Sequence, residues 1–548
     1  MLLKQDEVIT TAKWIGNAKE LRSGVTAFKE AIANICRPIF VVEHSDEAAV
    51  THNGTMIWGQ STNSEASGKP LLGFAPPVQP ADLGDPLFRR DLNLRYNYVV
   101  GAMANGITSM EMVQAAGEAG LIGFFGAGGL SLDQVAAAID RLAKAPSKMP
   151  YGFNLIHSPN DPQLEEAVVD LYISKGIRLV SASAYLGLTL PLVYFRVKGI
   201  HQTSEGTIVC PNRIVAKVSR IEVARKFFAP PPEKFLNILV DQGKISEQEA
   251  RLALRIPMAQ DITAEADSGG HTDNRPALTL LPTFLALRDE AMQRYRFPEQ
   301  LRVGLGGGIA TPESTAAAFS LGAAYVLTGS INQACVEADT SDAVREMLAQ
   351  AVQADVTMAP SADMFELGAK VQVLKRGTMF AMRASRLYEL YRGHDRYEQI
   401  PDSIRATIEK DYLQASFEES WRETRLFFEH RDPSQIERAE QDEKHKMALV
   451  FRSYLGRASL WAKNGDPARK IDYQIWCGPA MGAFNAWAKG SCLEKPTDRR
   501  VAEVGMNLLF GAAGLLRCNW LRSQGISIPA QAALFHPIPL AEIERRMA

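Results

Sequence analysis

The sequence is poor in three features that mark common protein classes. Its six cysteines include no pair at the C-x-x-C spacing of zinc sites and redox motifs, which excludes a zinc framework. No uninterrupted run reaches the roughly 18 apolar residues of a membrane span, and residues 1–16 are too polar for a secretory signal peptide. The formal net charge is only −2, without the basic field that nucleic-acid binding needs. We therefore expect a cytoplasmic protein with reduced thiols and no membrane or nucleic-acid partner.

The length of 548 residues exceeds what one compact core usually holds. Hydrophobic residues make up 46% and charged residues 22% of the chain, which is typical of a globular enzyme. Because an α/β barrel reaches about 250 residues as one unit, we expect one large catalytic domain with additions. The expected parts are a wrapping segment with a short strand over 1–90, a catalytic barrel over 91–340 and an appended, mainly helical region over 341–548.

From about residue 97, short apolar or β-branched runs alternate with alanine-rich helical runs, which is the rhythm of a parallel sheet. Eight such strands favour a closed TIM (β/α)8 barrel over an open sheet. A helical insertion over 220–256 follows the fifth strand and is expected to cover the barrel or to shape a substrate entrance. The expected strands cover 97–103, 121–126, 151–156, 178–183, 213–219, 260–266, 301–306 and 323–329.

Two glycine-rich turns follow the seventh and eighth expected strands. Bare backbone amides approach an anion closely, and the first turn runs into a helix that Thr311 caps with Pro312 at its first position. Each turn by itself is equally consistent with a tight structural loop. Barrel enzymes often hold a phosphate between these two loops, so the coincidence favours a phosphate site. The residues predicted to bind it are Gly306, Gly307, Gly308, Thr328, Gly329 and Ser330.

A histidine follows the sixth expected strand, in the string Ser-Gly-Gly-His over 268–271. His271 thus lies on a glycine-lined turn at the face of a barrel that carries the chemistry, next to Gly269 and Gly270. There it is predicted to donate a proton to a developing carbanion or to hold a substrate carbonyl. A structural histidine bonded to a carbonyl is the alternative. Glu265 and Asp267 either orient the ring or are solvated loop carboxylates.

The end of the first expected strand offers a small, apolar edge rich in backbone. Ala102, Met103 and Ala104 form this edge, which suits the flat face of an isoalloxazine ring, and Asn105 adds a side chain for a hydrogen bond.

Polar side chains inside other expected strands point to the same ligand. Burial of the polar side chains of Asn154 and Lys217 in barrel strands is unfavourable unless each has a polar partner. The edge of a flavin ring would meet both, while for Asn154 the alternative is an amide satisfied by neighbouring backbone. Ser183 closes the fourth strand and adds a weaker indication.

These residues together resemble the nitronate monooxygenase and FabK-type enoyl reductase superfamily of FMN barrels. The closer resemblance is to the PfaD family, stand-alone enoyl reductases that act in trans on polyunsaturated fatty acid synthases and related polyketide synthases. The stretches that carry it are 83–107, 261–276, 304–312, 358–391 and 476–487.

The resemblance implies FMN as prosthetic group, NADPH as reductant and a 2-enoyl thioester on an acyl carrier protein as substrate. It also implies a homodimer, since barrels of this kind often pair. His271 matches the family's active-site histidine, and the glycine turns match its phosphate loops. Met103, Asn154 and Lys217 fall where the superfamily contacts the flavin ring. One departure concerns the carboxylate before the glycines: simple members carry Glu-Ala-Gly-Gly-His, whereas this chain has Asp-Ser-Gly-Gly-His over 267–271.

A basic stretch is either a docking surface for an acidic carrier protein or a solvated helix face. It consists of Lys370, Lys375, Arg376, Arg383, Arg386, Arg392 and Arg396.

Three rival functions stay open. A nitronate monooxygenase would use the same barrel and flavin with oxygen, although a small nitronate gives no reason for the long C-terminal region. A non-catalytic assembly component of a synthase would bind no FMN. An IMP dehydrogenase-like barrel ranks last because the sequence shows no catalytic cysteine loop of that type.

Overall fold

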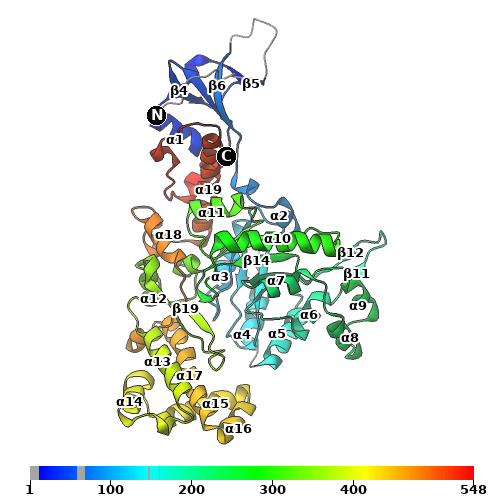
Figure 1. Cartoon of the computed structure of the whole chain (residues 1–548), viewed down its shortest axis with the longest axis vertical. Helices are drawn as coiled ribbons and strands as arrows, with labels where there is room; N and C mark the ends of the chain where they lie inside the picture. The colour runs from blue at the N-terminus through cyan, green and yellow to red at the C-terminus, as the bar shows by residue number, and fades with distance from the viewer. Residues whose placement is uncertain (1–11, 59–67, 146–148, 159–160) are drawn as a thin grey trace.

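The computed structural model describes residues 12–58, 68–145, 149–158 and 161–548. Most of residues 1–16, and with them the signal-peptide prediction, lie outside this part of the chain. A barrel occupies the middle of the molecule, with a small sheet at one end and a group of helices at the other (Figure 1). The C-terminus lies near the end that carries the sheet.

Eight parallel strands form a closed barrel in chain order, and the last strand pairs with the first through Val326–Tyr98 and Thr328–Val100. The strands are buried along most of their length, as expected of strands covered on both faces. The prediction of a TIM barrel is therefore confirmed. Its strands are β7 (Tyr98–Val100), β8 (Ile122–Phe125), β9 (Tyr151–Ile156), β10 (Leu179–Ser183), β13 (Arg213–Val218), β14 (Asp261–Glu265), β16 (Arg302–Gly306) and β17 (Val326–Thr328).

Seven helices follow the first seven strands and cover the barrel. Ser131 and Thr311 cap two of them through reciprocal capping boxes, and the cap at Thr311 is the one expected from the sequence. These helices are α3 (Met110–Glu118), α4 (Leu132–Ala143), α5 (Pro162–Ser174), α6 (Leu190–Val197), α7 (Ile221–Phe228), α10 (Ala277–Tyr295) and α11 (Pro312–Ser320).

The helical insertion after the fifth strand is confirmed, with one refinement. Its first helix, α7, packs against α10 as an ordinary barrel helix, so the additional helices are α8 (Glu233–Asp241) and α9 (Glu247–Ala253). A short hairpin of β11 (His201–Gln202) and β12 (Ile208–Val209) contacts α9. The sequence did not predict this hairpin because each strand has only two residues.

The eighth covering helix comes from the far end of the chain. Helix α19 (Val501–Ser523) packs against α11 and α3, between which the helix of the eighth strand belongs. Glycine allows the close approach, because a Cβ on Gly511 would lie 2.5 Å from Pro312 Cγ. Among the helices of the described ranges, α19 is the one long and apolar enough to cross a membrane, yet 83% of its most apolar window is buried inside the protein. We interpret it as a core helix.

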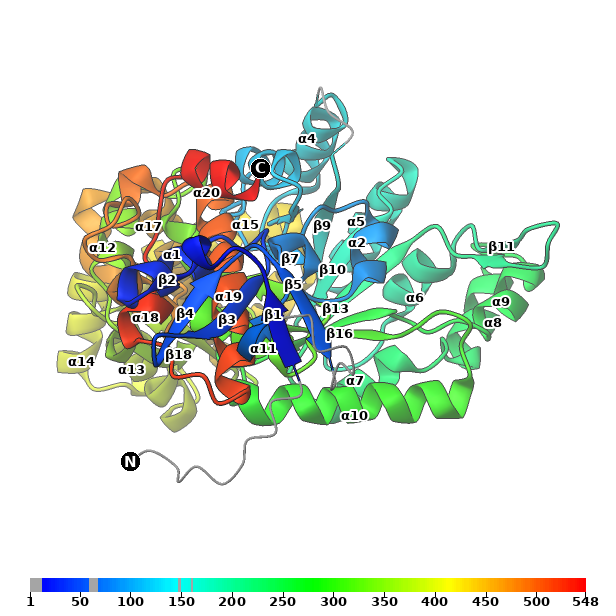
Figure 2. The same ribbon diagram turned by 90° about the horizontal axis from the view of Figure 1, so that it is seen from above.

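The N-terminal segment contains far more sheet than the single strand expected for it. Six strands form an antiparallel sheet beside helix α1 (Val25–Ala33), and this unit packs on α19 (Figure 2). Arg517 of α19 donates to the carbonyls of Ala31, Ile32 and Asn34 at the end of α1. The strands are β1 (Ala12–Ile15), β2 (Arg22–Ser23), β3 (Ile39–His44), β4 (Glu47–Thr51), β5 (Thr55–Trp58) and β6 (Lys69–Ala75).

The region after the barrel is mainly helical, but after its first helix, α12 (Asp342–Ala349), it contains a hairpin that the sequence did not predict. Strands β18 (Val356–Pro360) and β19 (Lys370–Leu374) pair with each other, and β19 also pairs with β15 (Gly270–His271), which follows the sixth barrel strand. Helices α14 (Asp402–Thr407), α15 (Phe417–Arg431), α16 (Ser434–Gln441) and α17 (Glu443–Asn464) follow, after α13 (Phe380–Gly393). We call residues 402–464 the helical subdomain.

The amino-terminal end of the barrel is closed by a buried group of charges. Arg302 Nε donates to Asp261 Oδ1 at 2.6 Å, and its NH1 donates to Asp91 Oδ2 at 2.8 Å. The side chains of Arg302 and Asp261 are only 1% and 2% exposed. Such an arrangement at this face stabilises the barrel and leaves the opposite face for chemistry.

Candidate active site

One cavity of about 1210 Å³ opens at the carboxyl ends of the barrel strands. The barrel loops form one side of it, and residues of the β18–β19 hairpin and of α15 and α17 form the other. His271 and every residue that the sequence predicted to bind the cofactor line this cavity, whereas Asp267 does not. The fold thus gathers loops from all eight barrel strands and a distant helical subdomain around one space.

The two glycine turns lie side by side, because β16 and β17 pair in the register Leu305–Val326 and Gly306–Leu327. Gly307 and Gly308 adopt φ values of +87° and +75°, which other residues rarely adopt. Among the described residues, no acceptor is recorded for the amides of Gly307, Gly308 and Gly329. Adjacent bare amides of this kind fit a phosphate.

The other two residues of the second turn support it in different ways. The side chain of Thr328 is buried, where it donates to Tyr98 Oη at 2.8 Å and accepts from Asn332 Nδ2 at 2.9 Å. Its contribution to the cavity is therefore through its main chain. The Ser330 hydroxyl accepts from the amide of Gly478 at 3.0 Å, which leaves its proton available to a ligand.

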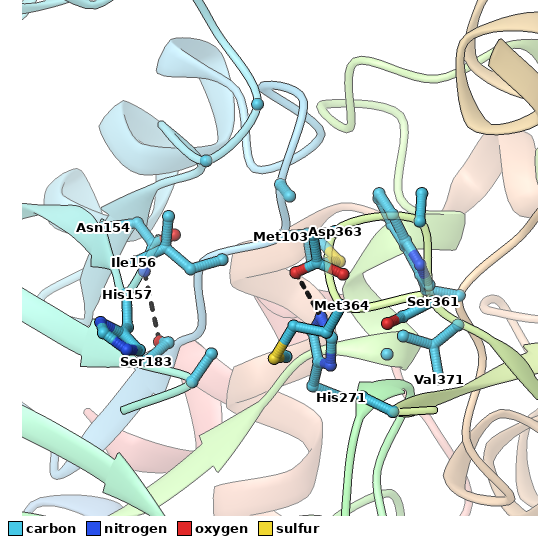
Figure 3. Close-up of a pocket in the computed structure, with 18 of the residues that line it drawn as sticks. Met103, Asn154, Ile156, His157, Ser183, His271, Ser361, Asp363, Met364 and Val371 are labelled. Carbon is cyan, nitrogen blue, oxygen red and sulfur yellow. Dashed lines mark hydrogen bonds and ion pairs between the residues drawn. The ribbon is translucent and has the colours of Figure 1, made fainter. Parts of the chain in front are cut away.

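His271 lies on strand β15 rather than on the free turn expected from its glycine neighbours. Pairing of Gly270 and His271 with β19 fixes its backbone. Its Nε2 lies 3.0 Å from Asp363 Oδ2, on the loop between β18 and β19 (Figure 3). Nδ1 is therefore the ring nitrogen left to a substrate.

Two opposing effects set the pKa of His271. Burial alone lowers it, but the hydrogen bond and negative charge of Asp363, with a contribution from Glu265, raise it above its ordinary value. Burial raises the pKa of Asp363, but the pairing with His271, together with hydrogen bonds from its own backbone amide and from Ser361, brings it below its ordinary value. The pairing thus favours the imidazolium form of His271 and the carboxylate form of Asp363, an arrangement suited to a proton donor.

Neither carboxylate expected to orient His271 is bonded to it. Asp267 accepts from Asn274 and Gln372 at 2.8 and 2.7 Å and thereby holds the loop. Glu265 instead binds Lys217, whose Nζ lies 2.8 Å from its Oε1. Lys217 therefore has a partner within the protein, and its side chain also lines the cavity.

Asn154 is partly satisfied by its neighbours. Its Nδ2 donates to Ser181 O at 3.0 Å and to Ser183 Oγ at 3.2 Å, while no donor in the described ranges reaches its Oδ1. A ligand with an N–H edge would complete it. Asn105 has another role, since its Nδ2 bonds Ser459 Oγ on α17 at 3.1 Å and so links the barrel to the helical subdomain.

Ala102, Met103 and Ala104 line the cavity as expected. The backbone there is fixed because the Met103 amide donates to Thr108 Oγ1 at 2.9 Å, and that hydroxyl donates to Gly101 O. No group of three or more His, Cys, Asp or Glu side chains able to hold a metal ion occurs within the described part of the chain.

The basic stretch does not form one face. Arg383 is buried, where it pairs with Asp472 and donates to Asp411 O at 2.8 Å, so it is unable to contact a partner. Lys370 lies at the cavity, whereas Arg376 pairs with Asp355 at 3.4 Å on the other end of β19.

Residues 89–376 match the nitronate monooxygenase family, and residues 394–473 match the inserted helical domain of [acyl-carrier-protein] S-malonyltransferases. The chain is 46% identical to polyketide biosynthesis protein PksE of Bacillus subtilis over 79% of its length. It is also 45% identical over 82% of its length to one of the polyunsaturated fatty acid synthase subunits of Thraustochytrium sp.. It spans only 56% and 31% of these two relatives.

A solved structure matches over a larger share of its own length. The enoyl reductase domain of MlnA, from the macrolactin cluster of Bacillus amyloliquefaciens, is 38% identical, with a TM-score of 0.77 over 81% of this chain and 99% of that domain. The nitronate monooxygenase match alone covers more than half of the 548 residues. The chain therefore belongs to the nitronate monooxygenase family of oxidoreductases, and the resemblance to PfaD-type enoyl reductases expected from its sequence is confirmed.

Proposed function

We propose that the chain is an FMN-dependent enoyl reductase that uses NADPH to reduce 2-enoyl thioesters on acyl carrier protein, in polyunsaturated fatty acid or polyketide synthesis. The observation that carries the proposal is the shared cavity: unpartnered glycine amides and a carboxylate-bound His271 face the same space. The similarity to the MlnA enoyl reductase domain supports the reaction. The synthase relatives and the helical-domain match support a carrier-bound substrate.

The residues present fit FMN. The amides of Gly307, Gly308 and Gly329 would hold its phosphate, and the edge from Ala102 to Ala104 would lie against its ring. Asn154 Oδ1 and Lys217 would take the polar edge of the ring. When bound, FMN supplies the redox centre through which the hydride of NADPH reaches the β-carbon of the substrate.

His271 supplies the proton that the reaction consumes. Reduction of the double bond adds a hydride at the β-carbon and leaves negative charge between the α-carbon and the thioester oxygen. An imidazolium whose Nδ1 faces the cavity either donates a hydrogen bond to that oxygen or transfers its proton to the α-carbon. Asp363 favours the protonated ring and fixes its orientation.

The experiment starts from the absorbance spectrum of the purified protein. We expect a flavin spectrum, bleaching by NADPH without oxygen and recovery on addition of a crotonyl thioester. His271→Ala should retain FMN but reoxidise slowly with the thioester. A colourless protein that takes up no FMN would favour the non-catalytic assembly component.

Nitronate oxidation is the second candidate, because the family match itself favours it. Recovery of the bleached flavin with oxygen and a nitronate, but not with the crotonyl thioester, would establish that reaction instead. The wall that the helical subdomain adds to the cavity favours the larger substrate.

A further inference from the structure

A second imidazole–carboxylate pair lines the cavity opposite His271. His157 directly follows β9, and its Nδ1 lies 3.3 Å from Glu165 Oε2 on α5. Figure 3 shows His157 beside Asn154 and Ser183, on the wall that faces the one with His271 and Asp363. The two pairs therefore serve different parts of the cavity.

Glu165 is unusually buried for a carboxylate, with a side chain that is 3% exposed. Tyr185 Oη donates to its Oε1 at 3.0 Å, and the Thr189 hydroxyl donates to the same oxygen. Burial and the nearby carboxylate raise the pKa of Tyr185, so the phenol remains a donor. With His157, three donors from two barrel loops hold this carboxylate, and a buried charge is tolerated only with such partners.

This arrangement fixes one face of the His157 ring. The Nδ1–H group donates to the carboxylate, and the ring stacks on Tyr185 with a centroid distance of 5.2 Å. Within the described ranges no partner is recorded for Nε2, and the ring lines the cavity with 18% of its side chain exposed. A purely structural cross-link between β9 and α5 would not need a ring whose second nitrogen faces open space.

His157 lies beyond Asn154, the residue of β9 that is proposed to contact the flavin ring. It follows Asn154 by three residues, which places it about 10 Å further toward the opening. The lining of the same cavity includes the apolar side chains of Leu186 and Phe427, which are 49% and 55% exposed. This is the outer part of the cavity, through which the arm of a carrier-bound thioester would pass.

We propose that His157, oriented by Glu165, binds an amide group of the arm that carries the thioester. The inference rests on the proposed function. An amide offers both an N–H and a carbonyl oxygen, so it satisfies Nε2 whether the ring is neutral or protonated. A thioester carbonyl satisfies only the protonated ring, and His271 already serves that end of the substrate.

The test compares two crotonyl thioesters, one with an amide in its thiol part and one without. The N-acetylcysteamine thioester has one amide, and the S-ethyl thioester has none. The wild-type protein should prefer the first in kcat/KM. His157→Phe keeps the stacking on Tyr185 but removes both nitrogens, and it should lose about tenfold on the N-acetylcysteamine thioester, the equivalent of one hydrogen bond. The S-ethyl thioester should react unchanged.

Glu165→Gln tests the positioning role without removing the imidazole. It should show a smaller loss of the same preference, mainly in KM, and it carries the test alone if His157→Phe does not fold. His201→Phe is the control, because His201 is exposed on β11 and outside the cavity. A second readout is the quenching of the fluorescence of Trp476, which lines the cavity, by the saturated butyryl forms of the two thioesters. This titration gives a Kd for each thioester, and the Kd values should show the same preference independent of turnover.

Three outcomes would overturn the inference: equal losses on both thioesters, no loss on either, or a wild-type protein without preference. Variants are compared at equal flavin content. A wild-type protein that binds no flavin or reduces neither thioester would instead refute the proposed function, so the two failures are distinguishable.

Discussion

Replacement of Gly307 by alanine tests the phosphate site most directly. A Cβ at this position would lie 2.6 Å from the carbonyl carbon and oxygen of Ala266 and 2.8 Å from Asp267 O. These are backbone atoms of the loop that carries His271, so they do not yield easily. The left-handed φ costs an alanine about 1–2 kcal/mol, and overpacking adds about 1–3 kcal/mol. If the binding of FMN has to overcome this strain, the lower sum of about 2 kcal/mol corresponds to an affinity for FMN that is weaker by about 30-fold.

Gly308→Ala is the matched control, because φ there is +75° but nothing lies within 4 Å of the added Cβ. Only the left-handed strain remains, which predicts a loss of about 5–30-fold. The assay is titration of the flavin-free variants with FMN and with riboflavin, followed by fluorescence. Because riboflavin has no phosphate, the Gly307 variant should lose most of its preference for FMN. Equal weakening of both ligands, or a larger effect at Gly308, would refute the phosphate assignment.

Three further predictions concern charged groups. Asp363→Asn removes the charge that raises the pKa of His271, so burial should lower that pKa and move the basic limb of the kcat–pH curve to lower pH; an unchanged curve would show that His271 does not carry the proton. Arg302→Met leaves the buried carboxylate of Asp261 without its ion pair and should lower the free energy of unfolding by about 3–5 kcal/mol in urea titrations, and a loss below about 1 kcal/mol would contradict the buried pairing. Arg517→Met should accelerate hydrogen exchange in α1 and leave the barrel strands unchanged, whereas uniform acceleration would mean that α1 is not held locally.

The barrel was predictable because its pattern is local. Each strand is a short apolar run, and the residues that begin and end the neighbouring helices lie within a few positions of it. The strand boundaries found differ from those expected by at most three residues. The glycine turns were predictable for a related reason, since their positions at the ends of the seventh and eighth strands are fixed once the strands are counted. The closure of β17 on β7 then brings them together.

The partners of the two histidines were not predictable, because they depend on contacts distant in sequence or hidden by composition. Asp363 lies 92 residues after His271, on a hairpin whose pairing with β15 has no sequence pattern. Glu165 and Glu166 are consecutive in one helix, and two adjacent glutamates are typical of a solvated helix face. In the structure, however, the side chain of Glu165 is buried and that of Glu166 is half exposed. Only the packing of α5 distinguishes them.

The origin of α19 has a consequence for synthesis of the chain on the ribosome. All eight strands emerge long before Val501, so the nascent barrel presents an uncovered apolar seam between α11 and α3 while the hairpin and the helical subdomain are translated. Stable closure must await the last part of the chain, which also anchors the amino-terminal sheet. Premature termination before α19 should therefore yield an aggregation-prone product rather than a smaller working enzyme.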